Sequence, residues 1–130
     1  MLFILRFNTR LLWRGIVHDR SKFTWFEAKG FGGLLHRLSA STYGSQEYHA
    51  MLEELKPIIS HHHMNNRHHP EYYGEDGVSG MALIDLVEMF IDWQASIKKH
   101  ADGDIHKSID HNKGRHGLSD QLEAILRNST

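Results

Sequence analysis

A chain of 130 residues is long enough for about one domain with a single hydrophobic core. Its 15 basic and 16 acidic residues give a net charge of −1 with histidine counted neutral, which argues against a membrane partner or a nucleic-acid partner. The chain has no cysteine, so disulfides and thiolate metal sites are excluded and a cytoplasmic location is expected. Any metal must therefore bind to imidazole and oxygen ligands.

The first 16 residues are apolar, but Arg6, Arg10 and Arg14 interrupt them at every fourth position. This spacing excludes a signal peptide and a membrane span and predicts an amphipathic helix. The three arginines lie near one face of that helix. Four apolar residues are expected to face a core: Ile4, Leu5, Leu12 and Ile16.

A second helix is predicted to begin just after Phe23, because Thr24 and Glu27 fit a Thr-x-x-Glu capping box. We expect this helix to fade where three glycines follow closely, at Gly30, Gly32 and Gly33. Residues 34–44 are expected to form a loop or a frayed helix end.

A third helix is predicted from about Ser45 to His68, where apolar residues recur every three or four positions. Pro57 should kink or split this helix, and Pro70 should end it. The stretch PEYYGEDGVSG, residues 70–80, has the glycine content of an exposed loop. A long helix is then expected from about Met81 to His100.

A short helix from about Asp120 to Arg127, with Ser119 as its N-cap, completes the predicted elements. No alternating strand pattern is present in the sequence. We therefore predict an all-α fold, a single compact domain of about five or six helices spanning residues 1–130. Three tryptophans lie in apolar helical patterns and are expected in the core: Trp13, Trp25 and Trp93.

Five of the 12 histidines fall between His61 and His69. On a helix, His62 with His69, or His61 with His68, would project two imidazoles to the same side. Such convergence is what a metal site requires, and histidine has no helix propensity that would explain its accumulation on a surface. The alternative is a solvated polar helix end.

Two further groups carry possible metal ligands. His18 and Asp19 form an imidazole–carboxylate pair, which is otherwise common at helix boundaries as a capping pair. Asp85, Glu88 and Asp92 lie on one face of the predicted long helix. These three carboxylates either form a solvent-facing acidic stripe or contribute to a cation site, which would relieve their mutual repulsion.

The sequence resembles a family of short, uncharacterised bacterial and phage proteins at three segments: HDRSKF at residues 18–23, His62 with HHPE at residues 68–71, and EMFIDW at residues 88–93. The resemblance covers nearly the whole chain. The order of these residues is in turn similar to the HD-domain metal-dependent phosphohydrolases, most of all to the branch that cleaves cyclic dinucleotides.

That likeness implies an HD-like helical fold. It also implies an enzyme that uses a metal-activated water to hydrolyse a phosphoester, with a nucleotide as the most plausible substrate. The implied metal ligands are His18, Asp19, His62, His68, His69 and Asp92. Lys22 would be catalytic and would bind the substrate phosphate, together with Arg67, while Glu88 would hold an imidazole in its tautomer. One or two divalent ions are expected, with Fe, Mn, Ni, Co or Zn favoured over Mg.

The chain also departs from the HD pattern, since no histidine precedes His18 and GEDGVSG stands where a Gly-Tyr-Pro is expected. One alternative is a non-catalytic metal-binding structural or interaction module. Another is a nucleic-acid or protein adaptor, which the near-zero net charge disfavours. Its contact residues would be Arg6, Arg10, Arg14, Lys98, Lys99 and Lys107. A homodimer through the first and last helices is also compatible with the sequence.

Overall fold

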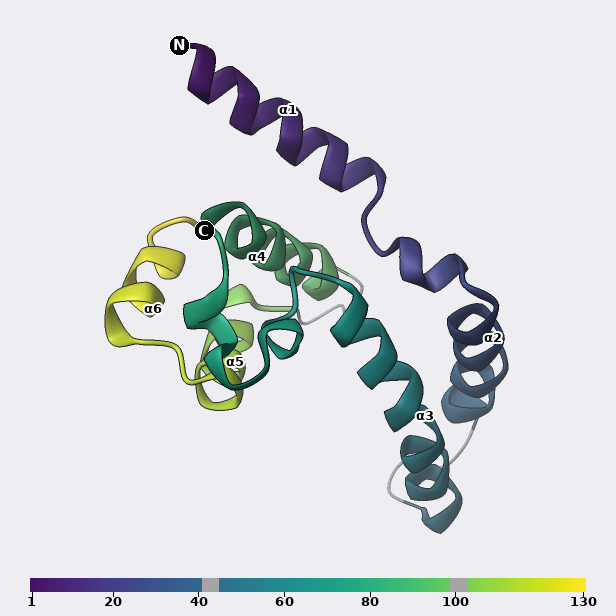
Figure 1. Cartoon of the computed structure of the whole chain (residues 1–130). Helices are drawn as coiled ribbons and strands as arrows, with labels where there is room; N and C mark the ends of the chain where they lie inside the picture. The colour runs from purple at the N-terminus through teal and green to yellow at the C-terminus, as the bar shows by residue number, and fades with distance from the viewer. Residues whose placement is uncertain (41–44, 99–102) are drawn as a thin grey trace. The chain divides into compact units, whose positions relative to one another are not determined.

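The computed structural model describes residues 1–40, 45–98 and 103–130, and throughout these ranges the chain is helical, with turns and no strand (Figure 1). The all-α prediction is confirmed. The helices are α1 (Leu2–Ile16), α2 (Trp25–Ala40), α3 (Gln46–Asn65), α4 (Leu83–Ile97), α5 (Ile105–His116) and α6 (Asp120–Arg127), with two 3-10 segments, η1 (Arg20–Phe23) and η2 (Pro70–Gly80). No helix in the described ranges is long and apolar enough to span a membrane.

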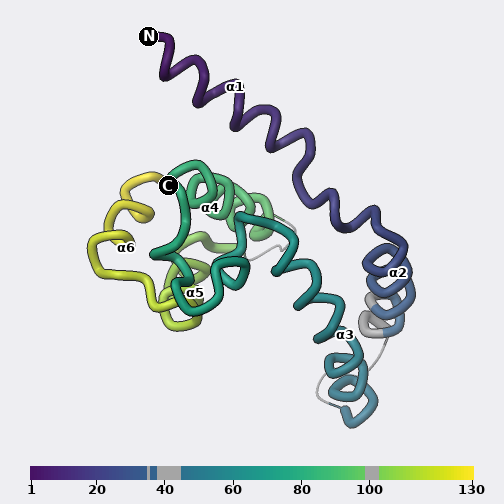
Figure 2. Tube along the Cα trace, in the orientation of Figure 1, coloured from purple at the N-terminus to yellow at the C-terminus, as the bar shows by residue number. Residues whose placement is uncertain are grey.

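The chain divides into two compact units. One unit consists of residues 17–66, and the other combines residues 1–16 with residues 67–130. Figure 2 traces the chain from one unit into the other and back. That residues 1–130 fold as a single domain stays a prediction.

Helices α2 and α3 pack along each other and form the centre of the 17–66 unit (Figure 1). The buried side of α3 is a stripe of Met51, Leu55 and Ile58, spaced by four and three residues, and His62 continues it. Ile58 lies against Gly30 of α2 so closely that a Cβ atom at residue 30 would be 2.8 Å from Ile58 Cγ1. Gly30 therefore allows the two helices to approach each other.

The sequence-based prediction that α2 fades at Gly30, Gly32 and Gly33 is wrong. The helix continues through them to Ala40, because packing against α3 compensates for the low helix propensity of glycine. The expected loop over residues 34–44 is thus helical as far as residue 40, and residues 41–44 lie outside the described part of the chain.

Helix α3 ends at Asn65 and not at His68, so His68 and His69 lie in the turn that follows it. Asn65 and Asn66 donate side-chain hydrogen bonds to the carbonyls of His61 and His62, both at 2.7 Å. These bonds satisfy carbonyls of the last turn, which allows the helix to stop. Pro57 lies within α3, which neither splits nor ends there.

The second unit has its hydrophobic core between α4, α5 and α6. Its buried residues are Phe90, Ile109, Leu118 and Leu126, with Trp93 packed against them. Helix α6 begins after Ser119 and ends at Arg127, as predicted. Helix α4 is described as far as Ile97, and residues 99 and 100 of the predicted helix lie outside the described part. Residues 70–80, predicted as a loop, form 3-10 turns.

Helix α5 was not predicted from the sequence, because it is mostly polar. Its apolar contribution to the core is Ile109, with Ile105 one turn before it. Its ends are nevertheless marked in the sequence. Asp104 accepts a hydrogen bond from the His106 N–H at 2.8 Å, and Gly117 ends the helix in the left-handed conformation at φ 63°.

The inward side of α1 also differs from the prediction. The four residues expected to face a core, Ile4, Leu5, Leu12 and Ile16, are all exposed, as are Trp13 and, in α2, Trp25. The less exposed residues of α1 are instead Phe7, Leu11 and Arg14. Because apolar residues nearly surround this helix, its sequence did not determine which side would be covered.

The packing at Gly30 predicts opposite effects for two Gly→Ala substitutions in α2. Gly30→Ala should destabilise the protein by about 1–3 kcal/mol, because the new methyl group overlaps Ile58. Gly33→Ala should stabilise it by about 0.5–1 kcal/mol, because glycine is unfavourable inside a helix and open space surrounds this position among the described residues. Urea denaturation followed by circular dichroism measures both.

Ile58→Val provides a rescue, since it removes the terminal methyl group of the side chain that the added methyl group at residue 30 would meet. The double variant should recover part of the loss caused by Gly30→Ala. Equal stability of Gly30→Ala and Gly33→Ala would show that the two helices do not approach each other at residue 30.

Candidate metal centre

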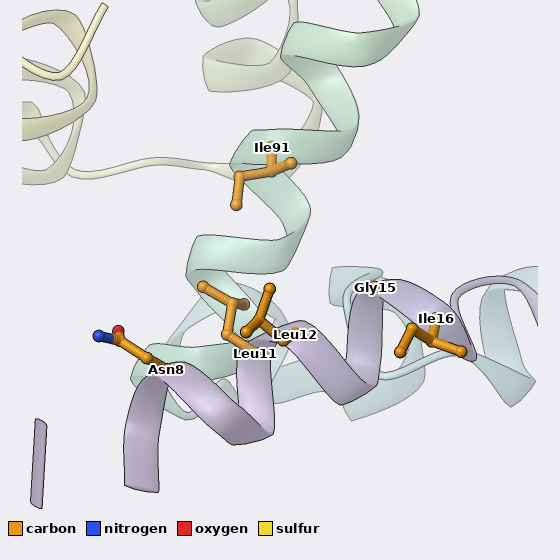
Figure 3. A pocket seen from close by; sticks show the side chains of 6 residues that line it. All are labelled: Asn8, Leu11, Leu12, Gly15, Ile16 and Ile91. Carbon is orange, nitrogen blue, oxygen red and sulfur yellow. The ribbon is translucent and has the colours of Figure 1, made fainter. Parts of the chain in front are cut away.

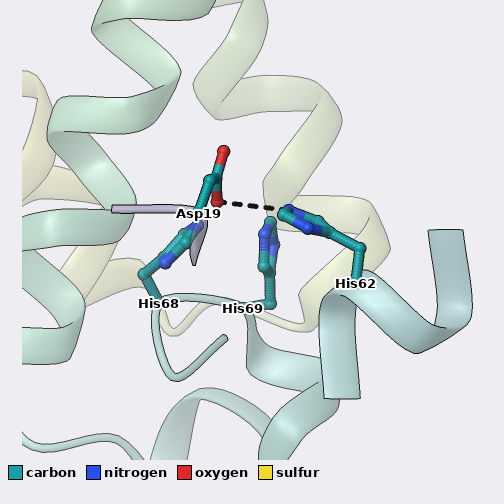
Figure 4. Close-up of side chains that lie close together, drawn as sticks. All are labelled: Asp19, His62, His68 and His69. Carbon is teal, nitrogen blue, oxygen red and sulfur yellow. Dashed lines mark ion pairs between the residues drawn. The ribbon is translucent and has the colours of Figure 1, made fainter. Parts of the chain in front are cut away.

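Two imidazoles meet one carboxylate at the start of the 17–66 unit. His62 Nε2 lies 3.3 Å from one oxygen of Asp19, and His18 Nε2 lies 3.4 Å from the other oxygen. Figure 4 shows the Asp19–His62 contact, with the imidazole of His62 directed from the end of α3 toward the carboxylate. Asp19 and His62 belong to a buried group of histidine and aspartate side chains that could hold a metal ion.

The backbone at Asp19 is left-handed, with φ 55° and ψ 29°. Among the described residues it is the one position other than glycine with a positive φ. This conformation lies between α1 and the single turn η1, and it directs the carboxylate toward His62. A non-glycine residue in this region is uncommon and indicates a position fixed by its surroundings, as functional sites often require.

Glu27 holds the opposite side of the His62 ring. Its side chain is fully buried, and its carboxylate lies 3.0 Å from His62 Nδ1 and 2.8 Å from His61 Nδ1. The hydroxyl of Ser21 donates a third hydrogen bond to it at 2.8 Å. Burial alone would raise the pKa of Glu27, but the hydrogen bonds from His61, Ser21 and His62 outweigh it and the pKa is lowered.

His62 therefore has a carboxylate at each ring nitrogen, Glu27 at Nδ1 and Asp19 at Nε2. Burial lowers the pKa of this imidazole, but the hydrogen bond and charge of Asp19, together with Glu27, outweigh burial and raise it. A carboxylate on Nδ1 is the arrangement that fixes the tautomer of a metal-binding histidine and leaves Nε2 for the metal. His62 and Asp19 thus offer an imidazole and a carboxylate of the kind that suits a divalent cation of the transition series.

Lys22 and Asn66 complete the surroundings of this group. The ammonium of Lys22 contacts Asp19 directly and balances the charge of its carboxylate. Asn66 donates to the hydroxyl of Ser21 at 2.7 Å, which links the end of α3 to η1. The two ends of the 17–66 unit therefore meet at the candidate metal centre.

The acidic face of α4 is not a solvent-facing stripe. Asp85 is fully buried and Glu88 is 8% exposed, whereas Asp92 is half-buried. Arg14 of α1 bonds to both buried carboxylates, with its Nη1 2.5 Å from Asp85 and its Nε in contact with Glu88. The cation that relieves their repulsion is thus a guanidinium.

Asp85 has further partners, which mark it as a structural group. The hydroxyl of Tyr73 donates to it at 2.7 Å, and Arg67 Nη2 lies 3.2 Å away. Burial would raise the pKa of Asp85, but bonds from Arg67, Tyr73 and Arg14 outweigh it and the pKa is lowered. Burial and this carboxylate together raise the pKa of Tyr73 to about 12.

The remaining predicted ligands lie in the 1–16 and 67–130 unit. His68 is buried, and its Nδ1 lies 3.5 Å from Glu88, the residue predicted to hold an imidazole. Its ring centroid is 4.1 Å from that of His69. Arg67, predicted to bind substrate, also lies over the ring of Tyr72, 5.8 Å from its centroid.

Sequence reasoning missed Glu27, Ser21 and Arg14. Glu27 was identified only as the last residue of a capping box, and Thr24 does accept the Glu27 N–H at 3.4 Å. The carboxylate, however, bonds to imidazoles from α3 that lie 34 and 35 positions away. The Thr-x-x-Glu motif does not indicate that the glutamate carboxylate also bonds to these imidazoles.

The fold and these side chains define an all-helical protein with a candidate centre for a metal ion. Residues 2–130 match a family described as "Family of unknown function (DUF5662)", and the chain belongs to that family. This confirms the predicted membership of a family without a known function. Comparison with curated proteins and with solved structures gives no match.

Acidification should test the buried pairing of Asp85. Because its pKa is lowered in the folded state, its contribution to stability is full above the unfolded value near 3.8 and is lost as the pH falls through the folded value. Asp85→Asn should cost about 1.5–3 kcal/mol at pH 7, since it removes the charge-assisted hydrogen bonds with Arg14, Arg67 and Tyr73 while Arg14 keeps its pairing with Glu88. It should also flatten the acid limb of a stability–pH profile.

Asp110→Asn is a suitable control, because Asp110 is exposed and pairs with Arg127 at the surface. That substitution should change stability by less than about 1 kcal/mol. An acid limb that is unchanged in Asp85→Asn would contradict the pairing.

Proposed function

We propose that this protein is a metal-dependent phosphohydrolase that cleaves a phosphoester in a small molecule. The observation that supports the proposal most is the position of His62, held at Nδ1 by the buried Glu27 while its Nε2 faces Asp19. An imidazole that is hydrogen-bonded at its far nitrogen and faces a carboxylate provides two donors suited to a divalent metal. One or two ions are proposed, with Fe, Mn, Ni, Co or Zn preferred to Mg.

The proposed ligands are His18, Asp19 and His62 from the 17–66 unit, joined by His68, His69 and Asp92. Chain connectivity supports this combination, because six residues span at most about 20 Å and His68 is six residues after His62.

A divalent cation in this centre supplies Lewis acidity and an activated water for attack on phosphorus. The protein's own residues would orient the substrate and balance its charge. Lys22, whose ammonium contacts Asp19, would bind a phosphate oxygen of the substrate. Arg67 would add a second positive group, although its bond to Asp85 limits its reach. Glu88, close to His68 Nδ1, would hold that imidazole as Glu27 holds His62.

A nucleotide is the proposed substrate class, on the basis of the likeness of residues 18–23 and 68–71 to HD-domain phosphohydrolases. The net charge of −1 favours a small phosphoester over a polynucleotide. The nucleic-acid adaptor also loses one of its predicted contacts, because Arg14 is bonded to Asp85 and Glu88. Another of its contacts, Lys99, lies outside the described residues. A cytoplasmic location, suggested by the lack of cysteine, remains part of this proposal.

A non-catalytic metal-binding module is the second candidate. One observation favours it: Lys22 already balances the charge of Asp19. In such a module the metal would link η1 to α3 and stabilise the fold. Removal of the metal by a chelator would then lower the melting temperature of the protein, and the protein would show no catalytic turnover with or without the metal.

Metal analysis of tag-free protein by inductively coupled plasma mass spectrometry tests the centre. Wild type should contain a stoichiometric transition metal, whereas His18→Ala and His62→Ala should lose most of it. Asp92→Ala should also lower the content if the second unit contributes a ligand. Loss of one ligand or of a group that orients it lowers metal affinity by roughly 10–100-fold or more.

His49→Ala is a matched control, because His49 lies on the exposed side of the same helix as His62. It should keep the wild-type metal content. Turnover of a nucleotide panel with added Mn, Co or Ni, absent in His62→Ala, would support hydrolysis over the structural module. Wild type without stoichiometric metal, even after reconstitution with Mn, Fe or Zn, would contradict the centre itself.

A further inference from the structure

Three large aromatic side chains are exposed near the start of the 17–66 unit. They are Phe23, Trp25 and Phe26, which are 86%, 75% and 46% exposed. They lie in residues 20–29, RSKFTWFEAK, together with three exposed cations: Arg20, Lys22 and Lys29. We call this run the basic–aromatic segment. Aromatic faces combined with positive charge are the groups with which proteins stack a nucleobase and hold its phosphate.

The exposed charge of the basic–aromatic segment is entirely positive. Its one acidic residue, Glu27, is fully buried, and the carboxylate is bonded to His61 and His62. The net charge of the whole chain is −1, so this positive charge is a local feature of the segment. A local cluster of cations attracts an anion such as a phosphate.

The basic–aromatic segment adjoins the candidate metal centre through two contacts. The ring centroid of Phe26 lies 5.0 Å from that of His61, with the two rings inclined by 58°. His61 precedes His62, whose Nε2 faces Asp19. The ammonium of Lys22 contacts the Asp19 carboxylate as well. An aromatic ring and an ammonium thus both lie next to side chains that are proposed to bind a metal.

Hydrogen bonds hold the basic–aromatic segment in one conformation. Thr24, between η1 and α2, donates to the Ser21 carbonyl from its hydroxyl at 2.6 Å and from its N–H at 2.9 Å. The Ser21 hydroxyl donates in turn to Glu27. The ammonium of Lys29 lies over the ring of Trp25, 4.6 Å from its centroid, which is a favourable cation–aromatic contact. Groups that are already ordered lose little conformational entropy when they bind a ligand.

A groove between α1 and α4 lacks such groups. It has a volume of about 650 Å³, and its lining residues are Asn8, Leu11, Leu12, Gly15, Ile16 and Ile91 (Figure 3). None of these six residues carries a charge. The groove therefore offers no cation to a phosphate, and the basic–aromatic segment is better suited to bind a phosphoester.

We propose that the basic–aromatic segment binds a nucleotide, with the base stacked on Phe26 and the phosphate bound by Lys22. This assignment rests on the proposed phosphohydrolase, and it adds the residue that would select a substrate carrying a base. Every base has an aromatic face, so stacking alone should discriminate little between one base and another. Three cations suit a single nucleotide, whereas a polynucleotide usually meets a longer basic groove.

Isothermal titration calorimetry of the full chain tests the stacking. The probes are the phosphonate analogues of adenosine monophosphate and of ribose 5-phosphate, in which a carbon atom replaces the ester oxygen and prevents hydrolysis. The adenosine analogue should bind about 5- to 100-fold more tightly, because it alone carries a base. Phe26→Leu should remove most of this difference, because leucine has no aromatic face, and should change the affinity for the ribose analogue by less than about twofold.

Phe3→Leu is the matched control, because Phe3 is an exposed phenylalanine of α1 and lies outside the basic–aromatic segment. It should keep the wild-type preference for the adenosine analogue. Lys22→Gln should weaken the binding of both analogues by a similar factor, because both carry the phosphonate. Equal affinity of the wild type for the two analogues, or an unchanged preference in Phe26→Leu, would overturn the base site.

Turnover of the two natural phosphates separates the base site from the proposed function. Equal kcat/KM for ribose 5-phosphate and adenosine monophosphate would support the phosphohydrolase and overturn the base site. A preference for the adenosine analogue that Phe26→Leu abolishes, without turnover of either phosphate, would support the base site and contradict hydrolysis of these phosphoesters. Much tighter binding of a single-stranded oligonucleotide than of the adenosine analogue would overturn the proposal and assign the rings to a nucleic-acid strand.

Discussion

The buried carboxylate of Glu27 is the constraint on which the 17–66 unit depends. It joins three elements, since Ser21 belongs to η1, Glu27 to α2, and His61 and His62 to α3. A fully buried carboxylate is stable only when its oxygens are paired, so these partners cannot move independently. The position of His62 relative to Asp19 follows from this fixed arrangement, and with it the geometry of the candidate metal centre.

The other unit also contains a fully buried carboxylate, which is paired with different groups. Asp85 is as deeply buried as Glu27, but its partners are the guanidiniums of Arg14 and Arg67 and the hydroxyl of Tyr73. A guanidinium has no lone pair to offer and keeps its proton, whereas an imidazole exchanges a proton for a metal. Of the two fully buried carboxylates, Glu27 therefore lies behind a group that is able to bind a cation and Asp85 does not, whereas the nearly buried Glu88 lies beside the imidazole of His68.

The sequence predicted what local patterns control. The beginning of α2, the whole of α6 and the buried stripe of α3 follow from capping residues and apolar spacing. The course of α2 through Gly30 did not, because the energy that keeps it helical comes from Ile58, 28 positions away. The pairing of Glu27 with His61 and His62 could not be predicted either, because these partners are also distant in the sequence. The exposed face of α1 was misjudged because apolar residues lie on opposite sides of it, and periodicity alone does not say which side is covered.

The carboxylate of Asp19 in the candidate metal centre faces an imidazole and an ammonium. His62 between Asp19 and Glu27 has a raised pKa, and Lys22 contacts Asp19 from outside. A metal ion held by His62 and Asp19 would compete with protonation of His62 and with the ammonium of Lys22, so its binding would weaken as the pH falls. The left-handed backbone of Asp19 costs roughly 1–2 kcal/mol, which is tolerated because these contacts fix the residue in place. This left-handed conformation keeps the Asp19 carboxylate beside His62 and Lys22, which is the position from which it would bind a cation.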